Sequence, residues 1–164
     1  SGQASMGLGL GVIAAAKAAQ GGASGVEEVL ERTRRAMERS QFFGLLDTLE
    51  YLEKGGRIGK AQGFLGSLLR IKPILTIKDG EAHPVERLRT RERGVERLVE
   101  MARERQPLEA LCVLHSTVPD EAEALRRRLE PLAPPEGVMV ARFGPVLGTY
   151  LGPRALGVAL VRGG

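Results

Sequence analysis

A strand–helix–strand succession in the second half of the chain limits the folds that this sequence can adopt. Leu108 to His115 is an almost continuous apolar run of strand length, and Val138 to Phe143 is another. A helical pattern from Glu121 to about Glu130 separates them. Two strands joined through a helix in one sheet run parallel, with a right-handed crossover. The sequence therefore predicts a sheet that contains a locally parallel pair.

The remaining strand-length segments predict antiparallel neighbours for this pair. Ile71 to Ile77 and Glu81 to Leu88 flank Asp79-Gly80, a strong hairpin signal. Pro73 suggests that the first of these strands lies at an edge or a bend. With Gln41 to Leu46 and Ala155 to Val161, we expect an α/β fold with a mixed sheet of about six strands. About six helices would pack on it, over Ser5 to Gln20, Gly25 to Glu38, Asp47 to Lys54, Ile58 to Leu69, Arg91 to Arg105, and Glu121 to Glu130.

Length and charge indicate one soluble domain over residues 1–164. No run of about 18 apolar residues is present, so we expect no membrane span. The chain has 24 basic and 20 acidic residues, and the basic residues, mostly Arg, often lie beside Glu, which argues against nucleic-acid binding. A single cysteine, Cys112, lies in a predicted buried strand and suits a cytoplasmic protein. The start at Ser1, without a methionine, is what a fragment would show.

Gly55-Gly56-Arg57-Ile58-Gly59-Lys60 is the segment with the clearest functional pattern. Asp47 can cap the short helix before it, with Glu50 completing a capping box, and the glycine pair ends that helix. Arg57 and Lys60 then fall in the first turn of the next predicted helix, where backbone N–H groups are unpaired. This turn is a candidate anion site.

The helix predicted after this turn carries small residues along one face. Gly59, Gly63, Gly66 and Ser67 share that face, although each glycine costs a helix about 1 kcal/mol relative to alanine. Either a closely packed neighbouring helix or a ligand lying along the groove would require such a face. The first predicted helix, Ser5 to Gln20, is apolar or small on almost every side, so we expect it to be buried.

The reactive residue types do not form a catalytic pattern. His83 and His115 are the only histidines and are far apart, and no cluster has metal-ligand spacing. No serine lies in a nucleophile elbow, and the 55–60 segment is not a Walker loop. The sequence therefore favours a binding protein without a cofactor over an enzyme.

Three segments resemble the DegV family. They are Thr48 to Glu86 (TLEYLEKGGRIGKAQGFLGSLLRIKPILTIKDGEAHPVE), Ser5 to Gly9, and Gly144 to Pro153. The resemblance implies a protein that binds a long-chain fatty acid and, in some bacteria, serves as the acyl-carrying subunit of a fatty acid kinase. Family members are close to twice this length. The chain resembles their C-terminal domain, so its partners would include its own N-terminal domain and the catalytic subunit of the kinase.

The resemblance also implies a ligand-binding set that this chain would share with the missing domain. In the family, the Thr and Ser that bind the carboxylate come from the N-terminal domain. The family often ends in Gly-Thr-His-Thr-Gly-Pro-Gly, but this chain has Tyr150 in place of the His. We expect an apolar tunnel with walls from Phe64, Leu65, Leu68, Leu69, Ile71 and Ile74. The predicted ligand-binding residues are Arg57, Gly56, Ile58, Gly59, Phe64, Leu68, Tyr150 and Gly152.

A second hypothesis from the residues alone is an enzyme domain that binds phosphate or a nucleotide through the Gly55–Lys60 loop. A third is a structural half whose surface serves only a partner protein.

Overall fold

A mixed sheet forms the centre of the protein in the computed structural model, which describes residues 2–64 and 71–164. Its six strands follow the order β3-β2-β1-β6-β4-β5. The strands are β1 (Ser40–Leu45), β2 (Lys72–Lys78), β3 (Glu81–Leu88), β4 (Leu108–His115), β5 (Met139–Arg142) and β6 (Leu156–Arg162). The helices are α1 (Met6–Gln20), α2 (Val26–Glu38), α3 (Glu50–Lys54), α4 (Arg91–Arg103), α5 (Pro119–Leu129) and α6 (Pro145–Leu151), with 3-10 turns η1 (Gly59–Phe64) and η2 (Glu130–Leu132).

The predicted α/β class and the parallel pair are confirmed. Strands β4 and β5 run parallel, with Val113 opposite Val140, and α5 connects them. The other strand pairings among the described residues are antiparallel, and β6 lies between β1 and β4. Asp79 and Gly80 both have positive φ, as the predicted two-residue hairpin turn requires.

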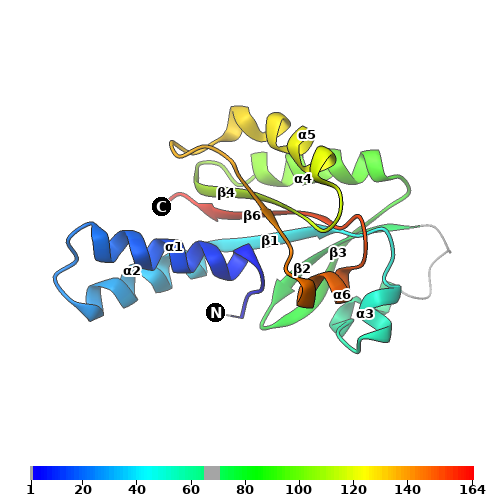
Figure 1. Cartoon of the computed structure of the whole chain (residues 1–164), viewed down its shortest axis with the longest axis horizontal. Coiled ribbons are helices and arrows are strands. Elements are labelled where there is room, and N and C mark those ends of the chain that lie inside the picture. The colour runs from blue at the N-terminus through cyan, green and yellow to red at the C-terminus, as the bar shows by residue number, and fades with distance from the viewer. Residues whose placement is uncertain (1, 65–70) are drawn as a thin grey trace.

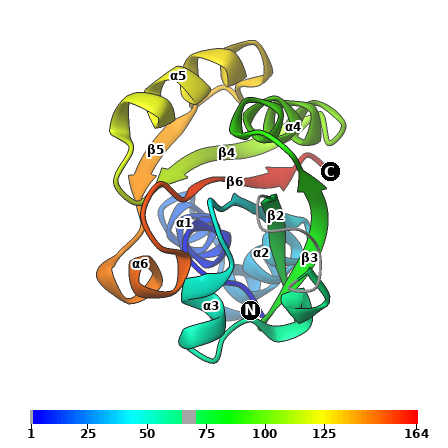
Figure 2. The same cartoon turned by 90° about the vertical axis from the view of Figure 1, so that its right-hand side faces the viewer.

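Helices cover both faces of the sheet because neighbouring strand residues point in opposite directions. Phe43 belongs to the core beneath α4 and α5, whereas Phe42 belongs to the core on the opposite face. On that second face, the α1–α2 hairpin covers one end of the sheet, and α3 and α6 lie side by side near the other end (Figures 1 and 2). The candidate site lies at the α3–α6 end.

The prediction of an all-round buried first helix is wrong. Leu8 and Val12 on α1 are 44% and 61% exposed, respectively. Helix α1 packs against α2 and the sheet on one side only, through Gly7, Leu10 and Gly11. A glycine at position 11 permits this contact, because a Cβ atom there would lie 2.0 Å from the Met37 sulfur.

Strand β2 is not an edge strand, although Pro73 suggested an edge or a bend. It lies between β1 and β3. Strand β2 pairs with β1 at only two positions, Gly44 opposite Leu75 and Leu45 opposite Ile74. Pro73 lies beyond these pairs, so the N–H group that proline lacks is not needed for a hydrogen bond to β1. Its carbonyl still accepts a hydrogen bond from the Leu46 N–H, at 3.0 Å.

The helix predicted from Ile58 to Leu69 is wrong in its described part. Residues 59–64 form the 3-10 turn η1, and residues 65–70, which include Leu65, Gly66, Ser67, Leu68 and Leu69, lie outside the described residues. Gly59 has φ +51°, which a right-handed α-helix does not allow. A Cβ atom at Gly59 would lie 2.8 Å from the Ala82 carbonyl oxygen. The close neighbour is therefore strand β3 and not a helix.

We expect the thiol of Cys112 to be unreactive in the folded chain. Its side chain is fully buried, and burial raises the pKa of the thiol to about 12. At pH 8 the native chain should not react with a thiol reagent such as DTNB except through unfolding, since the thiolate is the reacting species. In concentrated urea, one thiol per chain should react promptly. Rapid labelling of the native chain would contradict the buried placement.

Candidate functional site

A cavity of about 400 Å³ lies at the α3–α6 end of the molecule. Segments far apart in the sequence form its walls: the turn after α3, the start of η1, the β2–β3 hairpin and α6. Its polar side chains come from Arg57, Glu81 and Tyr150. The larger apolar side chains that line it are those of Leu52, Ile77, Val146, Leu147 and Leu151.

The end of α3 fixes the backbone of Arg57. Gly56 has φ +64°, and its N–H donates to the Glu53 carbonyl at 3.0 Å. The Arg57 N–H donates to the Leu52 carbonyl at 2.9 Å. This pair of bonds is a Schellman motif, which requires a left-handed residue at the helix exit. The prediction that the glycine pair ends the helix is confirmed.

Tyr150 lies beside Arg57 and against the end of α3. The Arg57 guanidinium carbon is 5.7 Å from the centre of the Tyr150 ring, a cation–π distance. A Cβ atom at Gly55 would lie 2.4 Å from the same ring, so only glycine permits this approach. On the other side of the contact, a Cβ atom at Gly152 would lie 2.3 Å from the Tyr51 ring. Helices α3 and α6 thus meet through two tyrosine–glycine contacts.

The structure brings half of the predicted ligand-binding residues together. Gly56, Arg57, Gly59 and Tyr150 line the one cavity. The other predicted residues are placed elsewhere. Ile58 and Phe64 are partly buried against the neighbouring core, with the Arg87 guanidinium 4.7 Å above the Phe64 ring. Gly152 lines an adjacent cavity, and Leu68 lies outside the described residues.

Ile74 does not form a wall of this cavity. It is fully buried in the core beneath α4 and α5, on the other face of the sheet. The alternation of side chains along β2 explains the difference, since neighbouring residues such as Leu75 face the cavity side.

One local expectation around the 55–60 loop is wrong in part, and another is wrong. In the turn where unpaired N–H groups were expected, the Arg57 N–H donates to the Leu52 carbonyl, and the preceding N–H groups of Gly55 and Gly56 donate to the carbonyls of Tyr51 and Glu53. Asp47 does not cap α3, which begins without a side-chain cap. The Thr48 hydroxyl instead accepts the Glu50 N–H at 3.2 Å.

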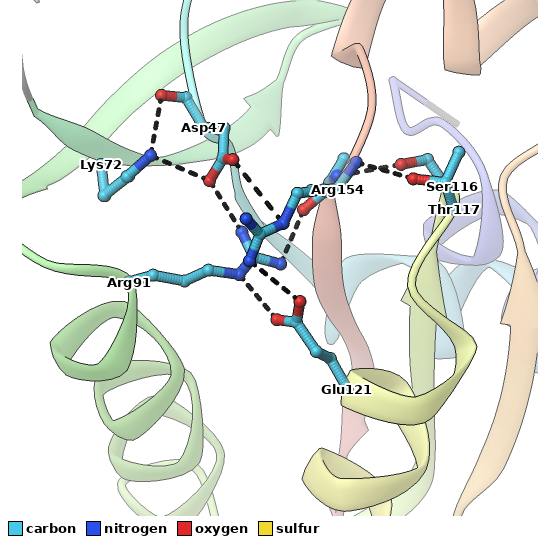
Figure 3. Close-up of polar contacts among 8 residues, drawn as sticks. Asp47, Lys72, Arg91, Ser116, Thr117, Glu121 and Arg154 are labelled. Atoms are coloured by element: carbon cyan, nitrogen blue, oxygen red, sulfur yellow. Dashed lines mark hydrogen bonds and ion pairs between the residues drawn. The ribbon is translucent and has the colours of Figure 1, made fainter.

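Asp47 instead belongs to a cluster of charged residues that sequence reasoning missed (Figure 3). Its carboxylate pairs with Lys72 at 3.0 Å, Arg91 at 2.9 Å and Arg154 at 3.8 Å. Burial alone would raise the pKa of Asp47, but the hydrogen bond from Lys72 and the charges of Arg91 and Arg154 lower it overall. Glu121 completes the cluster by pairing with both arginines. These residues come from different elements, so no local pattern marks them.

A second cavity, of about 700 Å³, is lined in part by Pro145, Gly148 and Thr149 of α6 and by Gly152 and Pro153 after it. Ser116, Thr117, Arg142 and Thr149 give it a polar lining. The neighbouring His115 has a buried Nδ1 without a hydrogen-bond partner among the described residues. Burial and the nearby charge of Arg142 lower the pKa of His115, which favours the neutral form of the imidazole.

Within the described residues, no group of His, Cys, Asp and Glu is arranged to hold a metal ion. Nor does that part of the chain contain a helix of the length and apolar character needed to cross a membrane.

Comparison with known proteins assigns the chain to a family. A sequence model described as "Uncharacterised protein, DegV family" matches residues 1–163. The chain belongs to the DegV family. A DegV domain-containing protein of Streptomyces coelicolor is 38% identical over 164 residues, which cover 98% of this chain and 58% of that protein. Protein DegV of Bacillus subtilis is 33% identical, over 88% of this chain and 52% of its own length.

Solved structures of DegV proteins share this fold. A DegV family protein from Thermus thermophilus, described by its fatty acid binding, superposes with a TM-score of 0.84 at 32% identity, covering 96% of this chain and 57% of that one. DegV from Bacillus subtilis, described as a fatty acid binding protein, gives 0.78 at 30% identity, covering 96% and 57%. The chain spans little more than half the length of these DegV relatives.

The contact between Gly152 and Tyr51 yields a test of the α3–α6 packing in this DegV chain. Gly152→Ala should destabilise it by about 2 kcal/mol or more, because a positive φ and a clash with the ring combine. Gly22→Ala is the control, since Gly22 also has a positive φ but its Cβ would meet no atom within 4 Å. That change should cost only about 1 kcal/mol. Urea denaturation would measure both.

The clash with the Tyr51 ring causes the destabilisation by Gly152→Ala only if removing that ring reduces the destabilisation. In a Tyr51→Ala background, Gly152→Ala should cost clearly less than in the parent chain. An unchanged cost would leave backbone strain alone as the explanation.

Proposed function

We propose that this chain forms one side of a site for a long-chain fatty acid, with Arg57 and Tyr150 beside the acid's carboxylate. The observation that carries the proposal is the mainly apolar cavity in which these two polar side chains lie together. Its volume of about 400 Å³ falls within the range of roughly 300–1,000 Å³ typical of small-molecule sites. The description of two DegV relatives as fatty acid binding supports the same ligand.

The chemistry of the lining matches an amphiphile. Each methylene moved from water into an apolar wall contributes about 0.8 kcal/mol. A carboxylate that leaves water must find a charge or a hydrogen-bond donor. Among the described residues, no carboxylate pairs with Arg57, and the nearby Glu50 pairs with Lys54 instead. The Arg57 guanidinium therefore remains available for a two-point contact with a carboxylate, and the Tyr150 hydroxyl can donate as well.

We infer that a second, N-terminal domain completes the site. The length of the DegV relatives leaves room for a domain of similar size. The family resemblance implies that this domain supplies hydroxyl groups to the carboxylate. The 164-residue chain alone would then hold only part of the site. In this proposal the protein is not itself an enzyme: it works in the cytoplasm and presents the carboxylate to the catalytic subunit of a fatty acid kinase.

The alternative, a phosphate or nucleotide site on the Gly55–Lys60 loop, has less support. A phosphate-binding loop needs free backbone N–H groups. Three of those in this loop are already used to end α3.

Filling the cavity should abolish fatty acid binding by the full-length protein. Ala4 lines the cavity, so Ala4→Phe places a ring where the acyl chain would lie. Ala19→Phe is the matched control, because Ala19 is exposed on α1 and does not line this cavity. We expect the parent and the control to retain about one fatty acid per molecule, and Ala4→Phe to retain little, as measured by native mass spectrometry and lipid extraction. A parent protein without saturable fatty acid binding would refute the proposal.

Removing the Arg57 guanidinium should impair carboxylate presentation more than stability. In the full-length protein, Arg57→Ala should slow acyl-phosphate formation with the partner kinase by about tenfold or more, equivalent to roughly 1.4 kcal/mol. The melting temperature should barely change, because the side chain is exposed. Lys60→Ala is the control, since Lys60 is exposed and does not line the cavity. Equal losses in the rate of acyl-phosphate formation for both variants would favour the phosphate-loop alternative. An unchanged rate in Arg57→Ala would mean that Arg57 has a purely structural role.

A further inference from the structure

Arg91 connects three separate segments of the chain through one guanidinium group. It is the first residue of α4, and it is only 8% exposed. Its Nε donates to the Glu121 carboxylate at 2.6 Å, and its Nη1 donates to the Asp47 carboxylate at 2.9 Å. Its Nη2 donates to the backbone carbonyl of Arg154 at 2.7 Å (Figure 3). Every nitrogen of the buried guanidinium thus has an acceptor.

Two of these partners stand next to the helices that form the cavity. Asp47 lies between the end of β1 and the start of α3, so it belongs to the segment that enters α3. Arg154 lies between the end of α6 and the start of β6, so it belongs to the segment that leaves α6. Arg91 therefore joins the entry of one helix to the exit of the other.

The segment that leaves α6 needs such anchoring. Gly152 and Arg154 both have positive φ, at +75° and +60°. A left-handed backbone is unfavourable for a residue with a Cβ atom, so surrounding contacts must hold Arg154 in place. The Arg154 N–H donates to the Thr117 hydroxyl at 3.1 Å, and the next N–H, of Ala155, donates to the Ser116 hydroxyl at 2.9 Å. The Arg91 bond to the carbonyl holds the same residue from its other side.

We propose that Arg91 is a positioning residue for the fatty-acid site, holding α3 and α6 so that Tyr150 stays beside Arg57. The proposal rests on the proposed function for its functional consequence. A buried arginine that served only charge balance would be satisfied by its two carboxylates. The third bond goes to the backbone that follows α6, and a lysine lacks the planar fork needed to donate in these three directions.

Arg91→Lys tests this role, with Arg97→Lys as the matched control. Arg97 also lies on α4 and also bonds several carboxylates: Glu86 at 2.8 Å, Glu100 at 3.1 Å and Glu104 at 2.6 Å. None of its partners belongs to α3, to α6 or to the segments next to them. Both variants therefore remove guanidinium–carboxylate bonds from the same helix, but only Arg91 has partners in the segments next to α3 and α6.

The readout is the environment of the two tyrosines at the α3–α6 contact. The full-length protein would carry 3-fluorotyrosine, and Tyr51→Phe and Tyr150→Phe would assign the two ¹⁹F resonances. We expect Arg91→Lys to shift or broaden both resonances and to weaken palmitate binding by about tenfold or more. We expect Arg97→Lys to leave both quantities unchanged. Unaltered resonances in Arg91→Lys, or equal changes in both variants, would overturn the proposal.

A milder variant decides the matter if Arg91→Lys does not fold. Thr117→Val keeps the side-chain shape but removes the acceptor for the Arg154 N–H, so it loosens the same segment without changing charge. The Tyr150 resonance should move. An unmoved resonance would show that the segment around Arg154 does not position Tyr150, and this would refute the role proposed for Arg91, which acts on α6 through that segment. If the parent protein does not bind palmitate, the proposed function fails, whereas the resonances still show whether Arg91 positions Tyr150.

Discussion

Burial of strand β6 on both faces is the constraint on which the architecture depends. Every residue from Leu156 to Val161 is buried, and neighbouring side chains enter opposite cores. A strand buried in this way must have other strands on both sides and helices above and below. The segment that leads into β6 cannot move freely, because its next residues are fixed in the centre of the sheet. The end of α6 is therefore connected to the buried centre of the sheet.

The cavity end of the molecule is built from short elements that have little core of their own. Helix α3 has 5 residues and α6 has 7, and isolated helices of such length are unstable in water. Close glycine–tyrosine contacts and a network of charges around the buried Arg91 hold them instead. Such a network is demanding, since removing one partner leaves others buried without compensation. The network also fixes the positions of the segments that it joins, because the planar guanidinium group donates hydrogen bonds only in set directions.

The sequence predicted those parts of the fold that local patterns determine. Alternating and continuous apolar runs predicted the positions of the strands, and Asp79-Gly80 predicted the hairpin turn. The glycine pair correctly predicted that α3 ends just before Arg57, because the Schellman motif at that helix end depends only on neighbouring residues. The predicted helix after it was wrong at Gly59, whose positive φ depends on contact with strand β3.

The charged cluster could not be predicted in the same way. Asp47 and Arg91 are 44 residues apart, and Arg91 and Arg154 are 63 apart. A carboxylate before a short helix looks like a cap when only its neighbours in sequence are known. The ion pairs of Asp47 form only when folding of the sheet brings the end of β1, the start of α4 and the α6–β6 segment together. The pairing of Arg57 with Tyr150 depends on the same assembly.

The order of strands also determines how this protein can meet another. Its sheet ends in β3 and β5. Pro84 and the charged residues Glu81, Glu86 and Arg87 interrupt the outer edge of β3, and β5 has only 4 residues. Proline, charge and short length all hinder the addition of a foreign strand. Contact with another protein through backbone pairing at either of these edges is therefore disfavoured.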